Sequence, residues 1–167
     1  MLADQFSQIF RQEHRIVRDT LLDLIQAFVS RDKSRIQELI GQVAEHTGPH
    51  FRYEEESLYP ELVPIFGAEY VERLFSDHDR AIGTAKQLAA LGARESLSDQ
   101  DVAQAVVWVR SILPHVSDCD GLSIMVERLD EDKVQAIFDS RERSNAAGLN
   151  LLVWAEQVRK RPLPAVI

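Results

Sequence analysis

The chain has 167 residues, of which 45% are hydrophobic and 28% are charged, a composition typical of one globular domain with a buried core. Its formal charge of −8 leaves no basic surface for phosphate groups, which argues against a nucleic-acid partner. No apolar run approaches the roughly 18–20 residues of a membrane span, and a single cysteine with no apolar signal core near the start favours a cytoplasmic protein.

Long segments place apolar residues at the spacing of one helix face, and the alternation typical of β-strands is scarcely sustained anywhere. The first predicted helix runs from about Asp4 to Val29, and residues 31–34 turn the chain. The second runs from about residue 36 to 65 and ends at Gly67. We expect a kink in it at Gly48-Pro49, because proline removes a backbone donor and crowds the preceding turn.

The third predicted helix covers about Glu69 to Leu91 and closes at Gly92. The fourth starts at Ser98, a favoured N-cap residue that acidic residues follow, and reaches about residue 129. Pro114 and Gly121 lie within it, so its middle should be irregular.

A fifth predicted helix, from about Asp132 to Arg159, precedes a tail at residues 161–167. Because short connections favour antiparallel neighbours, we expect an all-α fold, an up-down-up-down four-helix bundle with an additional C-terminal helix. The bundle would occupy about residues 4–129 of a single domain over 1–167, and the C-terminal helix and tail residues 130–167. That helix could cover the bundle or pair with a second chain, so a monomer and a homodimer both stay open.

The histidines all project onto the apolar faces of these predicted helices: His14, His46, His50, His78 and His115. Each bundle helix thus directs at least one imidazole inward, and Glu54 lies one turn after His50. One such histidine is more often a hydrogen-bonded core residue than a ligand. Several imidazoles together with a buried carboxylate, which costs several kcal/mol unless paired, instead predict metal ions. Imidazole and carboxylate ligands suit iron, manganese or zinc.

Some metal sites are excluded by residues that the chain lacks. No histidine has a glutamate three residues before it, as ferritin-like di-iron sites require. The zinc-protease motif is absent, and one cysteine excludes zinc sites with several thiolates. A single zinc ion held by His46, His50 and Glu54 stays open as an alternative.

Four blocks of sequence resemble the hemerythrin family of HHE cation-binding domains over about residues 8–129. These blocks are QEHRIV, HFRYEEESLYPEL, SDHDRA and LPHVSDCDGL. The resemblance implies a non-haem di-iron centre, that is, two iron ions with an oxo or hydroxo bridge. Carried over residue by residue, it implies bridging carboxylates from Glu54 and Asp120 and terminal ligands from His14, His50, His78 and His115.

One ligand of the family pattern is missing, because Leu74 stands where the five-histidine carriers have a further histidine. Either His46 replaces it, or one iron keeps a position open to water or substrate.

The spacing at the fourth helix raises a second question. His115 and Asp120 are five residues apart, about 140° around a regular helix, so a π-type turn is needed to bring them together. In a regular helix Cys119 would face the metal instead, as an additional ligand or simply as a small buried side chain. Tyr53 and Glu55 are the neighbours of Glu54 in the sequence and are candidates for hydrogen bonds to the ligands.

The resemblance leaves several functions open. The first is a protein that binds O2 or NO for sensing, storage or protection. The alternative is a di-iron oxidase, oxygenase or peroxidase that admits substrate or peroxide at the open position, with catalytic residues unknown. A domain whose histidines are merely packed is the third, and no residue identifies an organic substrate.

Overall fold

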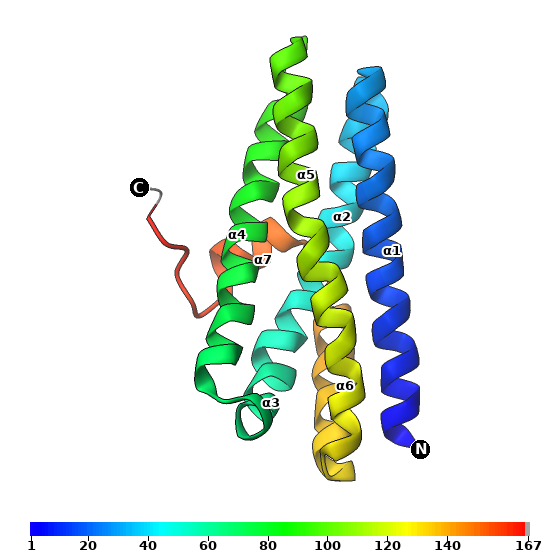
Figure 1. The fold of residues 1–167 in the computed structure, drawn as a ribbon, viewed down its shortest axis with the longest axis vertical. Helices are drawn as coiled ribbons and strands as arrows, with labels where there is room; N and C mark the ends of the chain where they lie inside the picture. The colour runs from blue at the N-terminus through cyan, green and yellow to red at the C-terminus, as the bar shows by residue number, and fades with distance from the viewer. Residues whose placement is uncertain (166–167) are drawn as a thin grey trace.

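The computed structural model describes residues 1–165, so the last two residues of the predicted tail lie outside the described part (Figure 1). Four long helices run along the molecule: α1 (Leu2–Ser30), α2 (Lys33–Tyr53), α4 (Ala68–Gly92) and α5 (Asp99–Asp120). The other elements are the π-helical turn η1 (Glu54–Leu58), α3 (Tyr59–Phe66), the 3-10 helix η2 (Gly121–Arg128), α6 (Glu131–Ala147) and α7 (Leu151–Gln157). Residues 1–165 contain no strand, and the expected all-α bundle is confirmed, with helical structure added at its C-terminal end.

The helix ends follow from local chemistry. Arg31 takes a left-handed conformation (φ 55°) that closes α1, and the Asp32 side chain then accepts the backbone N–H of Arg35 to begin α2. At α5 the Ser98 hydroxyl accepts the N–H of Asp101, whose carboxylate accepts the N–H of Ser98 in return. These turns keep the connections short and place successive helices side by side.

The helices differ from the predictions in three details. α2 is α-helical through Pro49, and the π-helical turn η1 follows directly after it. α5 is α-helical past Pro114 to Asp120, so of the two alternatives for this helix the regular one holds, and a 3-10 helix follows. The fifth helix is two helices, because Gly148 (φ 60°) ends α6 in the left-handed conformation and the Asn150 side chain caps α7.

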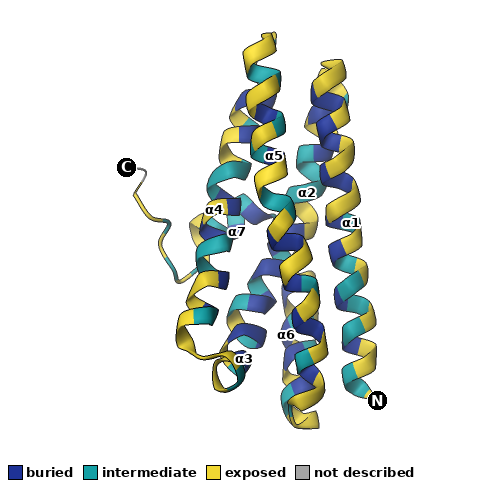
Figure 2. Cartoon of the chain, viewed as in Figure 1, coloured by how far each residue is buried: buried dark blue, intermediate teal, exposed yellow. Residues whose placement is uncertain are grey.

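Buried residues recur along the length of the bundle helices (Figure 2), and the apolar ones form two main clusters. Along α1 the first cluster takes Phe6 and Phe10 and the second begins at Val17, with His14 between them. Along α4 the first cluster includes Leu74 and the second begins at Leu88, and His78 lies between them. A polar layer therefore separates the two clusters.

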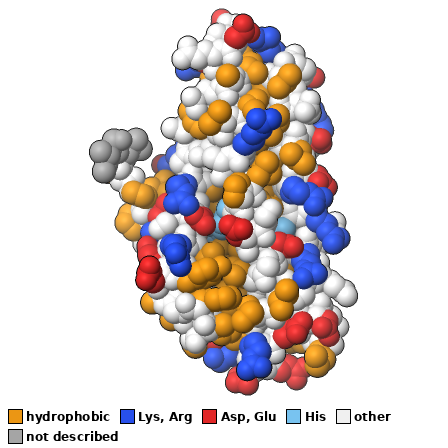
Figure 3. Space-filling model, viewed as in Figure 1, with side chains coloured by type: hydrophobic (Ala, Val, Ile, Leu, Met, Phe, Trp, Pro, Cys, Tyr) orange, Lys and Arg blue, Asp and Glu red, His pale blue; other side chains and the backbone are white. Residues whose placement is uncertain are grey.

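α6 packs against α1 and α2, and α7 packs against α2 and α4. Leu151 and Trp154 of α7 join Phe51 and Ile82 in a third apolar cluster. On the face shown in Figure 3, charges of both signs are interspersed and histidine surface is visible only in small patches at mid-height. None of the described helices has the length and apolar content of a membrane span.

Candidate metal centre

The first pair of imidazoles comes from α1 and α2. His14 donates from Nδ1 to the carbonyl of Phe10 at 2.8 Å, and His50 Nδ1 lies 2.8 Å from Glu13 Oε2. Their ring centroids are 4.6 Å apart, and both side chains are buried. Because each Nδ1 already has a partner outside the cluster, each Nε2 is left to face the interior of the bundle.

The second pair comes from α4 and α5. His78 Nδ1 lies 2.9 Å from Glu55 Oε1, and the ring of Phe51 stacks on the imidazole with centroids 3.7 Å apart. His115 Nδ1 lies 3.5 Å from Asp77 Oδ2, too far for a good hydrogen bond. The centroids of His78 and His115 are 4.9 Å apart, close to the separation within the first pair.

Glu54 lies between the two pairs and is 0% exposed. Its Oε1 is 3.2 Å from His50 Nε2, and its Oε2 is 3.1 Å from His78 Nε2. The π-helical turn begins at this residue and lets the consecutive side chains of Glu54 and Glu55 reach opposite nitrogens of the same ring, that of His78. One carboxylate thus touches both imidazole pairs.

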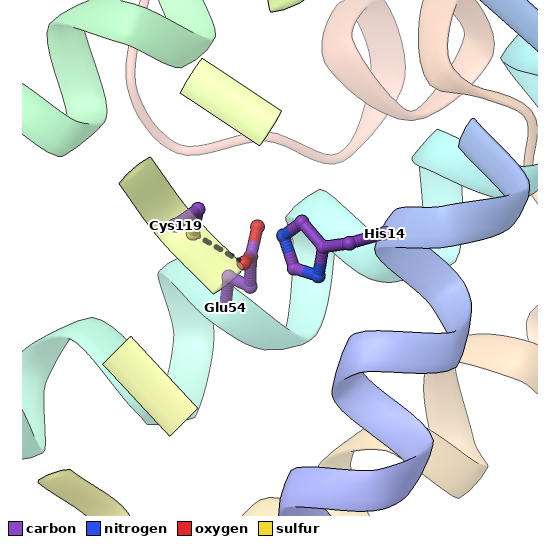
Figure 4. Close-up of side chains that lie close together, drawn as sticks. All are labelled: His14, Glu54 and Cys119. Carbon is purple, nitrogen blue, oxygen red and sulfur yellow. Dashed lines mark hydrogen bonds between the residues drawn. The ribbon is translucent and has the colours of Figure 1, made fainter. Parts of the chain in front are cut away.

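α5 directs Cys119 at the cluster, in place of Asp120. Because α5 is regular, Cys119 lies one turn after His115, and its thiol donates to Glu54 Oε1 at 3.0 Å. Figure 4 shows the side chains of His14, Glu54 and Cys119 converging from three elements. Asp120 is only half-buried and is in neither of the groups of candidate ligands that the structure brings together. The geometry thus follows the regular-helix alternative.

Two groups of candidate ligands share Glu54. One group is His14, Glu54 and Cys119, the other is Glu54, His78 and His115, and the ligand atoms within each lie within 4.8 Å of one another. Glu54 Oε2 and His50 Nε2 are buried, and although each lies 3.1–3.2 Å from another atom of the cluster, neither contact has the geometry of a hydrogen bond among the described residues. Such unpaired atoms cost free energy, and a coordinated cation would satisfy both. The donor set therefore fits a metal ion.

Electrostatics in the metal-free chain support the same interpretation. Burial lowers the pKa of His50, but the charges of Glu54 and Glu13 and the hydrogen bond to Glu13 outweigh it and raise that pKa to about 10. Burial would raise the pKa of Glu54, yet His50 and His78 hold it well below its usual range. The buried carboxylate thus favours positive charge beside it, which a metal ion bound to neutral imidazoles would supply.

Three further groups of the cluster, His14, Cys119 and Tyr59, are held neutral. Burial, reinforced by the charge of His50, lowers the pKa of His14 to about 4, although Glu54 and Asp120 oppose this shift. Burial raises the pKa of the Cys119 thiol and of the Tyr59 phenol well above their ordinary values. The Tyr59 hydroxyl lies 3.0 Å from His78 Nε2 and 3.5 Å from Cys119 Sγ, so a neutral phenol and thiol adjoin the second imidazole pair.

A cavity of about 30 Å³ lies beside His14, His50 and His115. Apart from these imidazoles and Thr47, the residues that line it are apolar, Leu151 of α7 among them. This volume suffices for one or two water-sized molecules. The space next to the cluster is therefore small and mostly apolar.

The structure corrects one expected histidine and adds groups that the sequence reasoning missed. His46 is exposed, so the expectation that all histidines lie on buried faces is wrong for it. Tyr53 and Glu55 do contact the cluster, the Tyr53 hydroxyl at 3.1 Å from His50 Nδ1. The sequence analysis did not name three groups that contact a histidine of the cluster: Glu13, Tyr59 and Asp77. Both acids directly precede a histidine, in QEHR and SDHD, but each contacts the histidine of another helix, so the contacts could not be read from this adjacency.

The four long helices each contribute a buried imidazole to one shared carboxylate, which defines the class as a metal-binding helical bundle. The family model described as the hemerythrin HHE cation binding domain matches residues 5–122, and the chain belongs to this family. It is therefore a hemerythrin-like cation-binding domain. Comparisons with curated proteins and with solved structures give no significant match.

Proposed function

We propose that this chain is a non-haem di-iron protein that binds O2 or NO for sensing, storage or protection. The observation that carries the proposal is the single buried carboxylate of Glu54, which touches an imidazole pair on each side and belongs to both candidate ligand groups. Two cations that share this carboxylate would offset its buried negative charge. Nitrogen and oxygen donors suit iron among the transition metals.

In this proposal His14 and His50 would hold one iron and His78 and His115 the other, and both ions would share the carboxylate of Glu54. Asp120, which the family pattern makes the second bridge, joins them only through a shift at the end of α5. Without that shift, Cys119 occupies its place next to Glu54.

Iron, when bound, supplies the electrons and the coordination position that O2 or NO needs. The chain supplies the surroundings. Leu74, which is 4% exposed, has no metal-binding atom and packs in the same apolar cluster as Tyr59. The apolar walls of the 30 Å³ cavity exclude water, while its volume limits what reaches the imidazoles to small molecules. The neutral Tyr59 hydroxyl and Cys119 thiol can donate hydrogen bonds into the cluster.

A second function, that of an oxidase, oxygenase or peroxidase, is favoured by the contact between Tyr59 and Cys119. A buried, protonated phenol and thiol 3.5 Å apart beside the cluster are two proton donors that could serve a small reactant.

Iron analysis and rapid mixing test the proposal. Protein purified from iron-supplemented medium should contain about two iron ions per chain, and mixing of the ferrous protein with O2 or NO should give a long-lived, reversible change in the visible spectrum. Decay to a ferric product within about seconds, faster with peroxide or an organic reductant, would instead support the enzymatic alternative. Less than about one metal ion per chain would leave only a structural domain with packed histidines.

A further inference from the structure

Two imidazoles of the cluster are held from outside by the same three-part arrangement of imidazole, carboxylate and arginine. His50 is held by Glu13, whose Oε1 accepts from Arg141 Nε at 2.7 Å. His78 is held by Glu55, whose Oε1 accepts from Arg159 Nη2 at 2.7 Å. Arg141 lies on α6 and Arg159 follows α7, so both lie beyond residues 5–122, the part that matches the family model.

Arg159 is the more tightly held of the two arginines. Its side chain is fully buried, and its Nε also donates to Glu55 Oε2 at 3.0 Å, so both carboxylate oxygens are fixed. Its Nη1 donates to Asp79 Oδ1 at 2.7 Å, and its guanidinium lies 5.7 Å from the ring centroid of Trp154. A fork of this kind sets the orientation of a carboxylate as well as its charge.

The tail beyond Arg159 anchors this arrangement to α4. Arg161 donates from Nε to Asp79 Oδ2 at 2.8 Å and pairs through Nη2 with Glu72 at 2.7 Å. Asp79, which directly follows His78 and is 6% exposed, thus binds two arginines of the tail. The segment after α7 is therefore fixed to the stretch of helix that carries His78.

We propose that Arg159 is a positioning residue for the metal centre, and that Arg141 has the same role on the opposite side. Arg159 fixes Glu55, Glu55 fixes the ring of His78 through Nδ1, and the ring then presents Nε2 to Glu54 at 3.1 Å. Groups that orient a histidine ligand in this way typically contribute about 10–100-fold to metal affinity. This inference rests on the proposed metal-binding function, and it makes the C-terminal segment a part of the centre.

The two arginines should differ in how much they contribute to metal affinity. The Arg141 side chain is 23% exposed and Glu13 21%, so water competes for both groups, whereas the Arg159 side chain has no exposure. Tyr53 gives Glu13 a further donor at 2.6 Å, which holds the carboxylate when Arg141 is absent. Loss of Arg159 should therefore weaken the centre more than loss of Arg141.

The test is anaerobic competition between the full chain and a chromophoric chelator for ferrous iron. Arg159→Gln should lower iron affinity by about 10–100-fold and shift the visible band of the oxidised protein. Lys160→Gln is the matched control, because Lys160 is the next residue, is exposed and forms no ion pair with the residues that the structure describes. It removes the same unit of charge and should leave affinity and spectrum unchanged.

A double variant separates positioning from a general loss of stability. If Arg159 acts through Glu55, then Arg159→Gln should cause no further loss of iron affinity in a Glu55→Gln background. Arg159→Lys keeps the charge without the two-pronged hydrogen bonding and should retain only part of the wild-type affinity. Equal affinity in Arg159→Gln and wild type, or equal losses in Arg159→Gln and Lys160→Gln, would overturn the inference. If wild-type protein itself binds no iron, the proposed function fails instead.

Discussion

Gly48 offers the sharpest test of how the C-terminal helices dock. It lies in α2, where a Cβ would fall 2.1 Å from the carbonyl oxygen of Leu149, 2.6 Å from the carbonyl carbon of Asn150 and 2.7 Å from the nitrogen of Leu151. All three are backbone atoms, so no side-chain rotation relieves the overlap. Gly48→Ala should force the start of α7 away from α2.

The cost follows from what α7 buries. Leu151 and Trp154 are 2% and 1% exposed, and full burial of a large apolar side chain is worth about 1.5–3 kcal/mol. Alanine in place of a glycine within a helix stabilises the helix by about 1 kcal/mol. We therefore expect a net loss of about 2–5 kcal/mol in the free energy of unfolding, which corresponds to a decrease in Tm of roughly 5–15 °C for a chain of this size.

Gly41→Ala is the control, because Gly41 lies in the same helix and an added Cβ meets nothing within 4 Å. This variant should gain up to about 1 kcal/mol. Urea unfolding followed by circular dichroism measures both values, and limited proteolysis near Gly148 reports whether α7 is docked. Equal stability of the two variants would refute the reasoning. Since α7 precedes Arg159, Gly48→Ala should also weaken iron binding.

Three further predictions concern the centre. Glu54→Gln should abolish iron binding and the visible spectrum, because it removes the carboxylate shared by both ligand groups, whereas His46→Ala should change neither, since His46 is exposed; metal analysis compares them. Burial opposes ionisation of Glu13, yet His50, Tyr53 and Arg141 lower its pKa from 4.5 to about 2. Its contribution to stability is therefore present above pH 4.5 and lost as the pH falls toward 2, so Glu13→Gln should flatten the stability of the metal-free protein over this range in urea titrations. Ala85→Leu should fill the cavity and slow NO binding in stopped-flow experiments without reducing iron content, and an unchanged rate would show that NO does not pass through it.

Sequence by itself determined the helical architecture and most of the cluster. The apolar period of each segment is a local property, and it placed His14, His50, His78 and His115 on buried faces. The spacing of Glu54 one turn after His50 was sufficient to bring that carboxylate to the same centre. These features depend only on the geometry of a single helix, which is fixed by hydrogen bonds between residues close in the chain.

Only the tertiary structure decided the partners that lie on other elements. Helical spacing permitted either Cys119 or Asp120 to face the cluster, and the regular end of α5 decided for Cys119. His46 shows the reverse case, since it lies one turn before His50 and yet is exposed, while the adjacent Thr47 is buried. The contact of Arg159 with Glu55 joins residues 104 positions apart. Such a contact depends on where Gly148 breaks the C-terminal helix and on how α7 packs, and no periodicity within one helix encodes that packing.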